Sequence, residues 1–267
     1  MIGIFNSIVW TLDPVFFSLG PLQVRYYGLL FATGFMLSFY IVSYFYKKAD
    51  LPVEEVDKLT VYVIIGAVLG ARFGHVFFYS WDLYEDNLLE ILKVWHGGLA
   101  SHGGVIGVLL AVYVYSRNYH RNYIWTLDRI AIPSALTGAL IRLGNLMNSE
   151  IYGTETALPW GFIYRINGET LPKHPTQIYE AIIYLIISGI LWLVYKKADS
   201  KVPRGKLFGM FLTLIFGMRF FVEFIKYHQS SFIGEDSYIN MGQLLSIPMI
   251  LIGIYFWKRS SNQTTEP

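Results

Sequence analysis

The sequence predicts an all-α, polytopic membrane protein with seven transmembrane helices. Of its 267 residues, 54% are hydrophobic and 15% are charged, whereas a soluble domain carries about 25% charged residues. The mean hydropathy is +0.42, and seven segments have roughly the 20 residues that a helix needs to cross the hydrocarbon core. This composition excludes nucleic-acid binding and ordinary soluble enzymes. The chain has no cysteine, so it supplies no disulfide, thiolate ligand or cysteine nucleophile.

The seven spans follow one another along residues 1–267, which we interpret as one integral membrane domain. The third and fourth spans are the most interrupted, because they contain Gly, Ser, His and Arg. In chain order the predicted spans are Gln23–Tyr46, Leu59–Ser80, Gly97–Tyr115, Ile124–Met147, Gln177–Tyr195, Gly205–Phe224 and Asn240–Trp257.

The connections between the spans predict the orientation, because cytoplasmic loops carry the excess of Lys and Arg. The connection after the fifth span has five basic residues, among them Lys196, Lys197 and Lys201, whereas the connection after the sixth has only Lys226. Summed over the whole chain, the two alternate sides carry 12 and 4 basic residues. We therefore expect the N-terminus outside and the C-terminus in the cytoplasm.

Two segments on the predicted outer face, residues 81–96 and 148–176, are unusual. Residues 81–96 place Leu88, Ile91 and Trp95 on one helical face opposite Glu90. This pattern fits an interfacial helix, or equally a solvated helix that covers the bundle. Residues 148–176 are long for a connection and rich in Gly, Pro and aromatics. We expect them to be either a lid that contacts substrate or an ordered structural loop.

Charged and polar side chains in the spans gather near one membrane face. An ionised group inside the membrane is costly unless it is paired or hydrated, so each is a candidate for function. Asp128 and Arg129 are the exception at the inner end, where snorkelling to the interface would explain them. The residues expected near the outer face are Arg25, Tyr26, His102, Arg142, Asn145, Asn148, Glu150, His174, Gln177, Glu180, Arg219, Glu223, Asn240 and Gln243.

This one-sided distribution indicates a protein that handles an outer-leaflet phospholipid. Guanidinium groups match phosphate oxygens in a bidentate manner, so several arginines at head-group depth imply an anionic head group. The rival class is a transporter or flippase for an anionic lipid, which needs polar groups at the midplane. A second rival is a phospholipid head-group hydrolase.

Two pairs on helices are the main candidates for binding phosphate. Arg142 and Asn145 share a helix face, and their alternative role is structural hydrogen bonding between helices. Arg219 and Glu223 are spaced to pair with each other, which would either close a helix end or orient Arg219 toward a phosphate.

His102 is the candidate general base, because it stands among glycines that let backbone and ligand approach. The alternative is an ordinary hydrogen-bonding histidine between helices. Arg72 is a structural candidate that would support the site. No His pair has metal-ligand spacing, so we expect no metal.

The motifs resemble the bacterial prolipoprotein diacylglyceryl transferase family along nearly the whole chain. They are LGPLQVRYYGLLFATG around Tyr26, HGGLASHGG with His102, IRLGNLMNSEIYG with Arg142, KHPTQIYEA with His174, GMRFFVEF with Arg219, and MGQLLSIPM with Gln243. The chain departs from the family pattern at Ile141, where glycine is usual, and at Ile215, where tyrosine is often found.

The resemblance implies a reaction and roles for the candidates. The family transfers the diacylglyceryl group of phosphatidylglycerol to the lipobox cysteine of a preprolipoprotein, without a cofactor, at the bacterial inner membrane. His102 would deprotonate the thiol and Arg142 would bind the phosphate. Arg219, held by Glu223, would be either a second hydrogen-bond donor to the phosphate or a gate at the lipid entrance. The remaining substrate-binding candidates are Tyr26, Asn145, Asn148 and Glu150.

Overall fold

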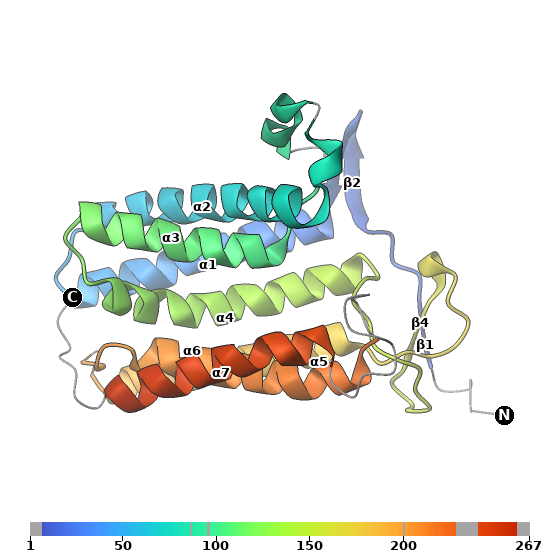
Figure 1. Cartoon of the computed structure of the whole chain (residues 1–267). Helices are drawn as coiled ribbons and strands as arrows, with labels where there is room; N and C mark the ends of the chain where they lie inside the picture. Colours follow the sequence, from blue (N-terminus) through green and yellow to red (C-terminus); the bar gives the residue numbers. More distant parts are fainter. Residues whose placement is uncertain (1–6, 86, 95–96, 200, 228–239, 261–267) are drawn as a thin grey trace. The chain divides into compact units, whose positions relative to one another are not determined.

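The computed structural model describes residues 7–85, 87–94, 97–199, 201–227 and 240–260, and its main elements are long α-helices (Figure 1). They are α1 (Tyr26–Lys48), α2 (Glu54–Tyr79), α3 (Ser101–Asn118), α4 (Tyr123–Met147), α5 (Thr176–Lys197), α6 (Lys206–Val222) and α7 (Met241–Ser260). Within the described residues, six helices are long and apolar enough to cross a membrane, namely all of these except α3. The chain is therefore a multi-pass membrane protein.

Helix α3 occupies the position of the third predicted span but is not among the six helices that are long and apolar enough to cross a membrane. It has 18 residues, begins with Ser101 and His102, and ends with Arg117 and Asn118. These polar ends leave a short apolar centre. The helix itself is confirmed, whereas its crossing of the membrane and the orientation of the termini stay predictions.

The described residues pack in two compact units, which we treat separately. Unit 1 contains the chain up to Ile41 and the part that starts at Asp128. Unit 2 contains Val42–Leu127. The single domain over residues 1–267 stays a prediction.

Unit 2 is built on close contact between α2 and α3. Glycines on both helices face one another, so that a Cβ atom added to Gly107 would lie 2.0 Å from the carbonyl oxygen of Gly66. A Cβ on Gly103 would likewise lie 2.2 Å from the oxygen of Gly70. Small residues let helix backbones approach in this way, and such packing drives helix association in membranes.

Unit 1 contains a buried interaction that corrects one prediction. Asp128 and Arg129 do not snorkel, because their exposed fractions are 0% and 2%. The Asp128 carboxylate accepts hydrogen bonds from the backbone N–H groups of Gly205 (2.6 Å) and Phe208 (2.8 Å), at the start of α6. Arg129 lies over the ring of Tyr195, 5.3 Å from its centroid. A carboxylate at a helix N-terminus satisfies N–H groups that the helix cannot, which explains its burial.

The residues before α1 form strands that the sequence analysis missed. Strand β1 (Ile8–Trp10) pairs in parallel with β4 (Phe162–Tyr164), and β2 (Val15–Leu19) pairs antiparallel with β3 (Leu22–Arg25). The predicted first span therefore starts too early, since Gln23 and Arg25 belong to β3. The segment 148–176 is ordered by the β1–β4 pair and by the short helix η5 (Arg165–Asn167).

The segment 81–96 is not one interfacial helix. It contains two short 3₁₀-helices, η2 (Trp81–Leu83) and η3 (Leu88–Leu92). Trp95, part of the predicted apolar face, lies outside the described residues. Arg72 holds this segment, because its buried guanidinium donates to the carbonyl oxygens of Ile91 (2.8 Å) and Gly97 (2.6 Å). Backbone carbonyls thus occupy the donors of Arg72, in agreement with the structural role expected for it.

Candidate active site

The centre of the candidate site is a buried carboxylate on α5 that binds two cations. Oε2 of Glu180 lies 3.2 Å from Nε of Arg142 on α4, and Oε1 lies 3.0 Å from Nζ of Lys226. The side chain of Glu180 is 1% exposed and that of Lys226 is 2% exposed. An unpaired charge would be very unfavourable in this position, so each of these groups needs its partners.

The same lysine continues the row of charges toward α6. Nζ of Lys226 lies 3.6 Å from Oε1 of Glu223, and Nε of Arg219 lies 3.5 Å from that oxygen. Asn240 donates to the backbone oxygen of Glu223 (3.0 Å) and to its carboxylate (3.2 Å). The predicted pairing of Arg219 with Glu223 is therefore confirmed, and it is one end of a longer network.

We call this network the ion row, and its members are Arg142, Glu180, Lys226, Glu223 and Arg219. Three cations and two carboxylates give it a net charge of +1. The two arginines at its ends are also its most exposed side chains, at 15% for Arg142 and 28% for Arg219. The carboxylates are buried beneath them. The row thus presents guanidinium groups, which can bind an anion through charge-assisted hydrogen bonds.

A third carboxylate, that of Glu150, lies next to the Arg142 end of the row. Arg142 and Asn145 share a helix face as predicted, with Nη1 of Arg142 3.4 Å from Oδ1 of Asn145. Asn145 and Asn148 both donate to Oε1 of Glu150, at 2.9 and 3.2 Å. Gln177 at the start of α5 donates to the backbone oxygen of Glu150 (2.7 Å). Amide groups therefore fix Glu150 beside Arg142.

The tyrosines at the start of α1 differ in their contacts. The ring of Tyr26 packs on Phe16 of β2, with 5.0 Å between ring centroids. Tyr27 lies against Gly144 of α4 and interacts electrostatically with Arg142 and Glu150. The sequence analysis proposed Tyr26 as a binding residue, and its neighbour Tyr27 is the one whose described contacts reach this cluster.

The loop 148–176 is fastened to the chain that leaves α6. Thr154 N donates to the carbonyl oxygen of Ile225 (2.9 Å), one residue before Lys226. Lys173 lies between Glu155 and Glu169, 3.2 Å from an oxygen of each. Burial opposes its charged form, but hydrogen bonds with the Tyr227 hydroxyl and with these two carboxylates outweigh burial and raise the pKa of Lys173. Burial lowers the pKa of His174 in the same loop. The loop is therefore positioned to hold Lys226 in the ion row.

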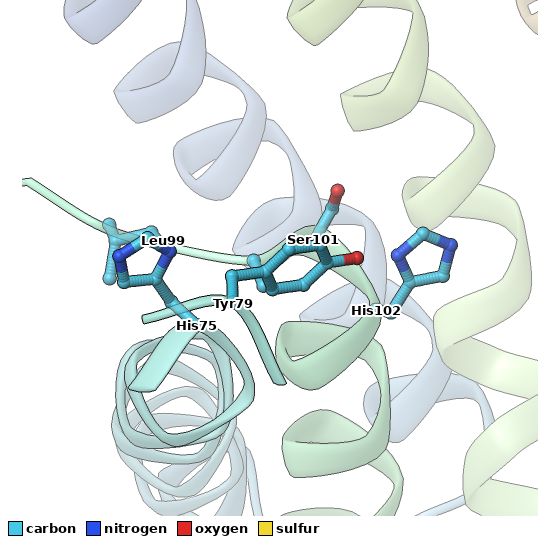
Figure 2. Close-up of a pocket in the computed structure, with 6 residues that line it drawn as sticks. His75, Tyr79, Leu99, Ser101 and His102 are labelled. Atoms are coloured by element: carbon cyan, nitrogen blue, oxygen red, sulfur yellow. The ribbon is translucent and has the colours of Figure 1, made fainter. Parts of the chain in front are cut away.

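His102 lies in unit 2, at the start of α3, and is described there by itself. It lines a pocket with His75 and Tyr79 of α2 and with Leu99, Ala100 and Ser101 (Figure 2). The side chain of His102 is exposed. Among the described residues, no three His, Asp or Glu side chains converge as a metal ion would require.

Sequence reasoning identified the two ends of the ion row but not its middle. Glu180 was expected only as a polar residue near the outer face, and Lys226 only as a loop cation. A carboxylate within the first two turns of a predicted span is the signal that points to Glu180, because such a charge needs a partner. Nothing in the local sequence of Lys226 reveals that Glu180 is that partner.

Comparisons with known proteins give a consistent result. Residues 14–259 match the family model described as "Prolipoprotein diacylglyceryl transferase". A phosphatidylglycerol–prolipoprotein diacylglyceryl transferase of Chloroherpeton thalassium is 46% identical over 259 residues, which cover 97% of this chain and 96% of the relative. A protein of the same name from Tolumonas auensis is 45% identical over 96% of this chain and 98% of its own. One from Porphyromonas gingivalis is 44% identical over 93% of both chains.

Proposed function

The chain belongs to the prolipoprotein diacylglyceryl transferase family, and from this premise we propose that its ion row binds the phosphate of phosphatidylglycerol during diacylglyceryl transfer. The chain is a transferase of lipoprotein maturation. It moves the diacylglyceryl group of phosphatidylglycerol to the cysteine thiol of a preprolipoprotein, which is the first step of that pathway. The names of its relatives support this activity over an anionic-lipid transporter or flippase.

The chemistry is a displacement at the glyceryl carbon that carries the phosphate. A carbon–sulfur bond forms to the acceptor cysteine, and the carbon–oxygen bond to phosphate breaks. The thiol loses its proton, and glycerol 1-phosphate leaves with the electron pair of the broken bond. Catalysis therefore needs a proton acceptor for the thiol and fixed positive charge for the phosphate.

The single observation that carries the proposal is the buried ion row with a partly exposed arginine at each end. Phosphatidylglycerol carries its one negative charge on the phosphate, which is the group that the guanidinium ends of the row can bind. Arg142 uses Nε for Glu180 and Nη1 for Asn145, so its orientation is set before a lipid binds. Preorganised donors stabilise developing charge without reorganisation, which is how such groups lower a barrier.

The other candidates receive roles that follow from their surroundings. Arg219, held by Glu223, is either a second hydrogen-bond donor to the phosphate or a gate for the lipid. Asn145, Asn148 and Glu150 form the polar cluster beside Arg142. The asparagine amides donate to the glycerol or phosphate oxygens, Glu150 accepts from a glycerol hydroxyl, and Tyr26 is a further hydrogen-bonding candidate. His102 takes the thiol proton, which is a role for an exposed imidazole in a pocket. The reaction requires no cofactor.

Membership of this family also implies where the protein lies in the cell. The protein lies in the bacterial inner membrane with α3 as a seventh span, its N-terminus outside and its C-terminus in the cytoplasm. The site faces the outer leaflet. Its partners are phosphatidylglycerol and preprolipoproteins that present a lipobox cysteine.

The experiment that tests this function is direct. Purified protein is incubated with phosphatidylglycerol and a peptide that contains a lipobox cysteine, and the peptide is weighed by mass spectrometry. A gain equal to one diacylglyceryl group supports the proposal. An unmodified peptide, with glycerol or glycerol phosphate released, would indicate the head-group hydrolase instead.

A further inference from the structure

The pocket of unit 2 contains a second histidine that the mechanism above does not use. His75 of α2 and His102 of α3 line it together, with Tyr79 and Ser101 (Figure 2). In Figure 2 the two imidazoles flank the side chains of Tyr79 and Ser101. Two imidazoles and two hydroxyls in one pocket can hydrogen-bond with a polar ligand from several directions.

The ring of His75 is held in a fixed position by its neighbours. It stacks on Tyr79, with 6.3 Å between centroids and 14° between planes, and it meets the edge of Tyr84 at 6.5 Å. A Cβ atom on Gly98 would lie 2.6 Å from Cδ2 and 2.7 Å from Nε2 of the imidazole. The ring therefore fills the space that a side chain at position 98 would take.

This packing fixes the ring but leaves its polar atoms unused within the protein. Among the described residues, no hydrogen bond to either ring nitrogen of His75 is found, and the side chain is half-buried. Water can satisfy the nitrogens of a half-buried histidine, and a ligand that enters the pocket can take the place of that water. A rigid ring with available nitrogens in a pocket is typical of a ligand contact.

We infer that His75 is a specificity residue for the acceptor peptide. His75 hydrogen-bonds the peptide beside its cysteine, in the pocket that His75 and His102 line together. This inference rests on the proposed function, which makes the ligand a cysteine-containing peptide and places its thiol at His102. His75 hydrogen-bonds the peptide without taking part in the chemical step. Leu99 and Ala100 supply the apolar part of the same pocket, which suits a short, mainly apolar peptide segment.

Two variants separate hydrogen bonding from packing. His75→Phe keeps a flat ring for Tyr79 and Gly98 but removes both nitrogens. His75→Gln loses the ring but keeps a polar end. As a matched control on the same helix, Phe78→Leu changes a side chain that is 80% exposed and does not line the pocket.

The test measures peptide binding and turnover separately in the full-length protein in detergent. Binding is followed by fluorescence anisotropy with a labelled lipobox peptide in which serine replaces the cysteine, so that no reaction occurs. We expect His75→Phe to raise the Kd of this peptide and the KM for the cysteine peptide about tenfold. The KM for phosphatidylglycerol and kcat should stay within twofold. His75→Gln should recover part of the peptide affinity, and Phe78→Leu should match the wild type.

The outcomes distinguish this inference from the proposed function. If the wild type binds the peptide and His75→Phe weakens that binding, the inference holds even where no diacylglyceryl transfer occurs. Peptide Kd and KM values for His75→Phe within twofold of the wild type would overturn it. An equal rise in the KM values of both substrates, with no gain for His75→Gln, would also overturn it, because it would show a general loss of structure.

Discussion

Nζ of Lys226 lies 3.0 Å from Oε1 of Glu180, and both side chains are almost completely buried. Through this contact two arginines on different helices, Arg142 of α4 and Arg219 of α6, belong to one network. Lys226 compensates the charge of both carboxylates that hold them. The lysine is therefore the residue on which the geometry of the whole ion row depends.

Removing this lysine should destabilise the protein and reduce turnover together. Lys226→Met leaves Glu180 and Glu223 with one cation fewer in a buried environment, and the loss of one partner of a buried pair costs about 3 to 5 kcal/mol. Thermal unfolding in detergent should show a clear fall in the Tm of Lys226→Met. Lys226→Arg, which keeps the positive charge, should keep most of the wild-type Tm. In the double variant Lys226→Met with Glu180→Gln, part of the stability should return. A Lys226→Met protein as stable as the wild type would show that the pairing is unimportant.

Arg142 should be needed for chemistry in a way that a point charge cannot replace. We expect Arg142→Ala to reduce transfer by at least about 100-fold while the protein still folds, because the loss of one charge-stabilising donor has an effect of this size. Arg142→Lys should stay badly impaired, since an ammonium group lacks the bidentate fork. The measurement is kcat/KM for phosphatidylglycerol, with Tm as the control for folding. Near-normal turnover by the lysine variant would reduce Arg142 to a structural residue.

The role of His102 predicts a distinctive pH profile. Below the thiol pKa of about 8.5 the thiolate fraction rises about tenfold per pH unit. His102→Gln, which lacks the base, should therefore be partly rescued as the pH rises from about 6.5 to 8.5. The wild type should gain less over this range, and Arg142→Ala should show no selective rescue because its defect concerns the phosphate. Parallel slopes for the wild type and His102→Gln would remove His102 as the base.

The orientation can be tested with single cysteines, because the natural chain has none. Thr170 and Lys201 are both exposed and lie in connections that we predict on opposite sides of the membrane. In intact cells, an impermeant maleimide should label Thr170→Cys and should not label Lys201→Cys until the membrane is opened. The reverse pattern would invert the topology and remove the outer-leaflet site.

The sequence predicted the parts of the site that depend on local spacing. Arg142 with Asn145, and Arg219 with Glu223, each stand on one helix at spacings that bring side chains together. The contact of Glu180 with Lys226 joins residues far apart in the chain, and no periodic pattern encodes it. The same reason explains β1, a three-residue strand whose partner β4 comes much later in the sequence.

Asp128 and Arg129 show a different limit of sequence reasoning. Their position at the predicted inner end of a span made an interfacial location reasonable. The actual partners of Asp128 are backbone N–H groups at the start of α6, and the identity of a residue does not reveal an interaction with a distant backbone. The packing of α4 against α5 and the start of α6 within unit 1 buries both residues.

The central claim is that the diacylglyceryl group moves to the cysteine while the phosphate leaves with the head group. The most direct test uses two batches of phosphatidylglycerol, one with a deuterated head-group glycerol and one with deuterated acyl chains. Each is incubated with the purified protein and a lipobox peptide, and the peptide and the released small molecules are analysed by mass spectrometry. We expect the acyl label on the peptide and the head-group label only in free glycerol 1-phosphate. Head-group label on the peptide, or release of glycerol 1-phosphate without any change in peptide mass, would contradict the claim.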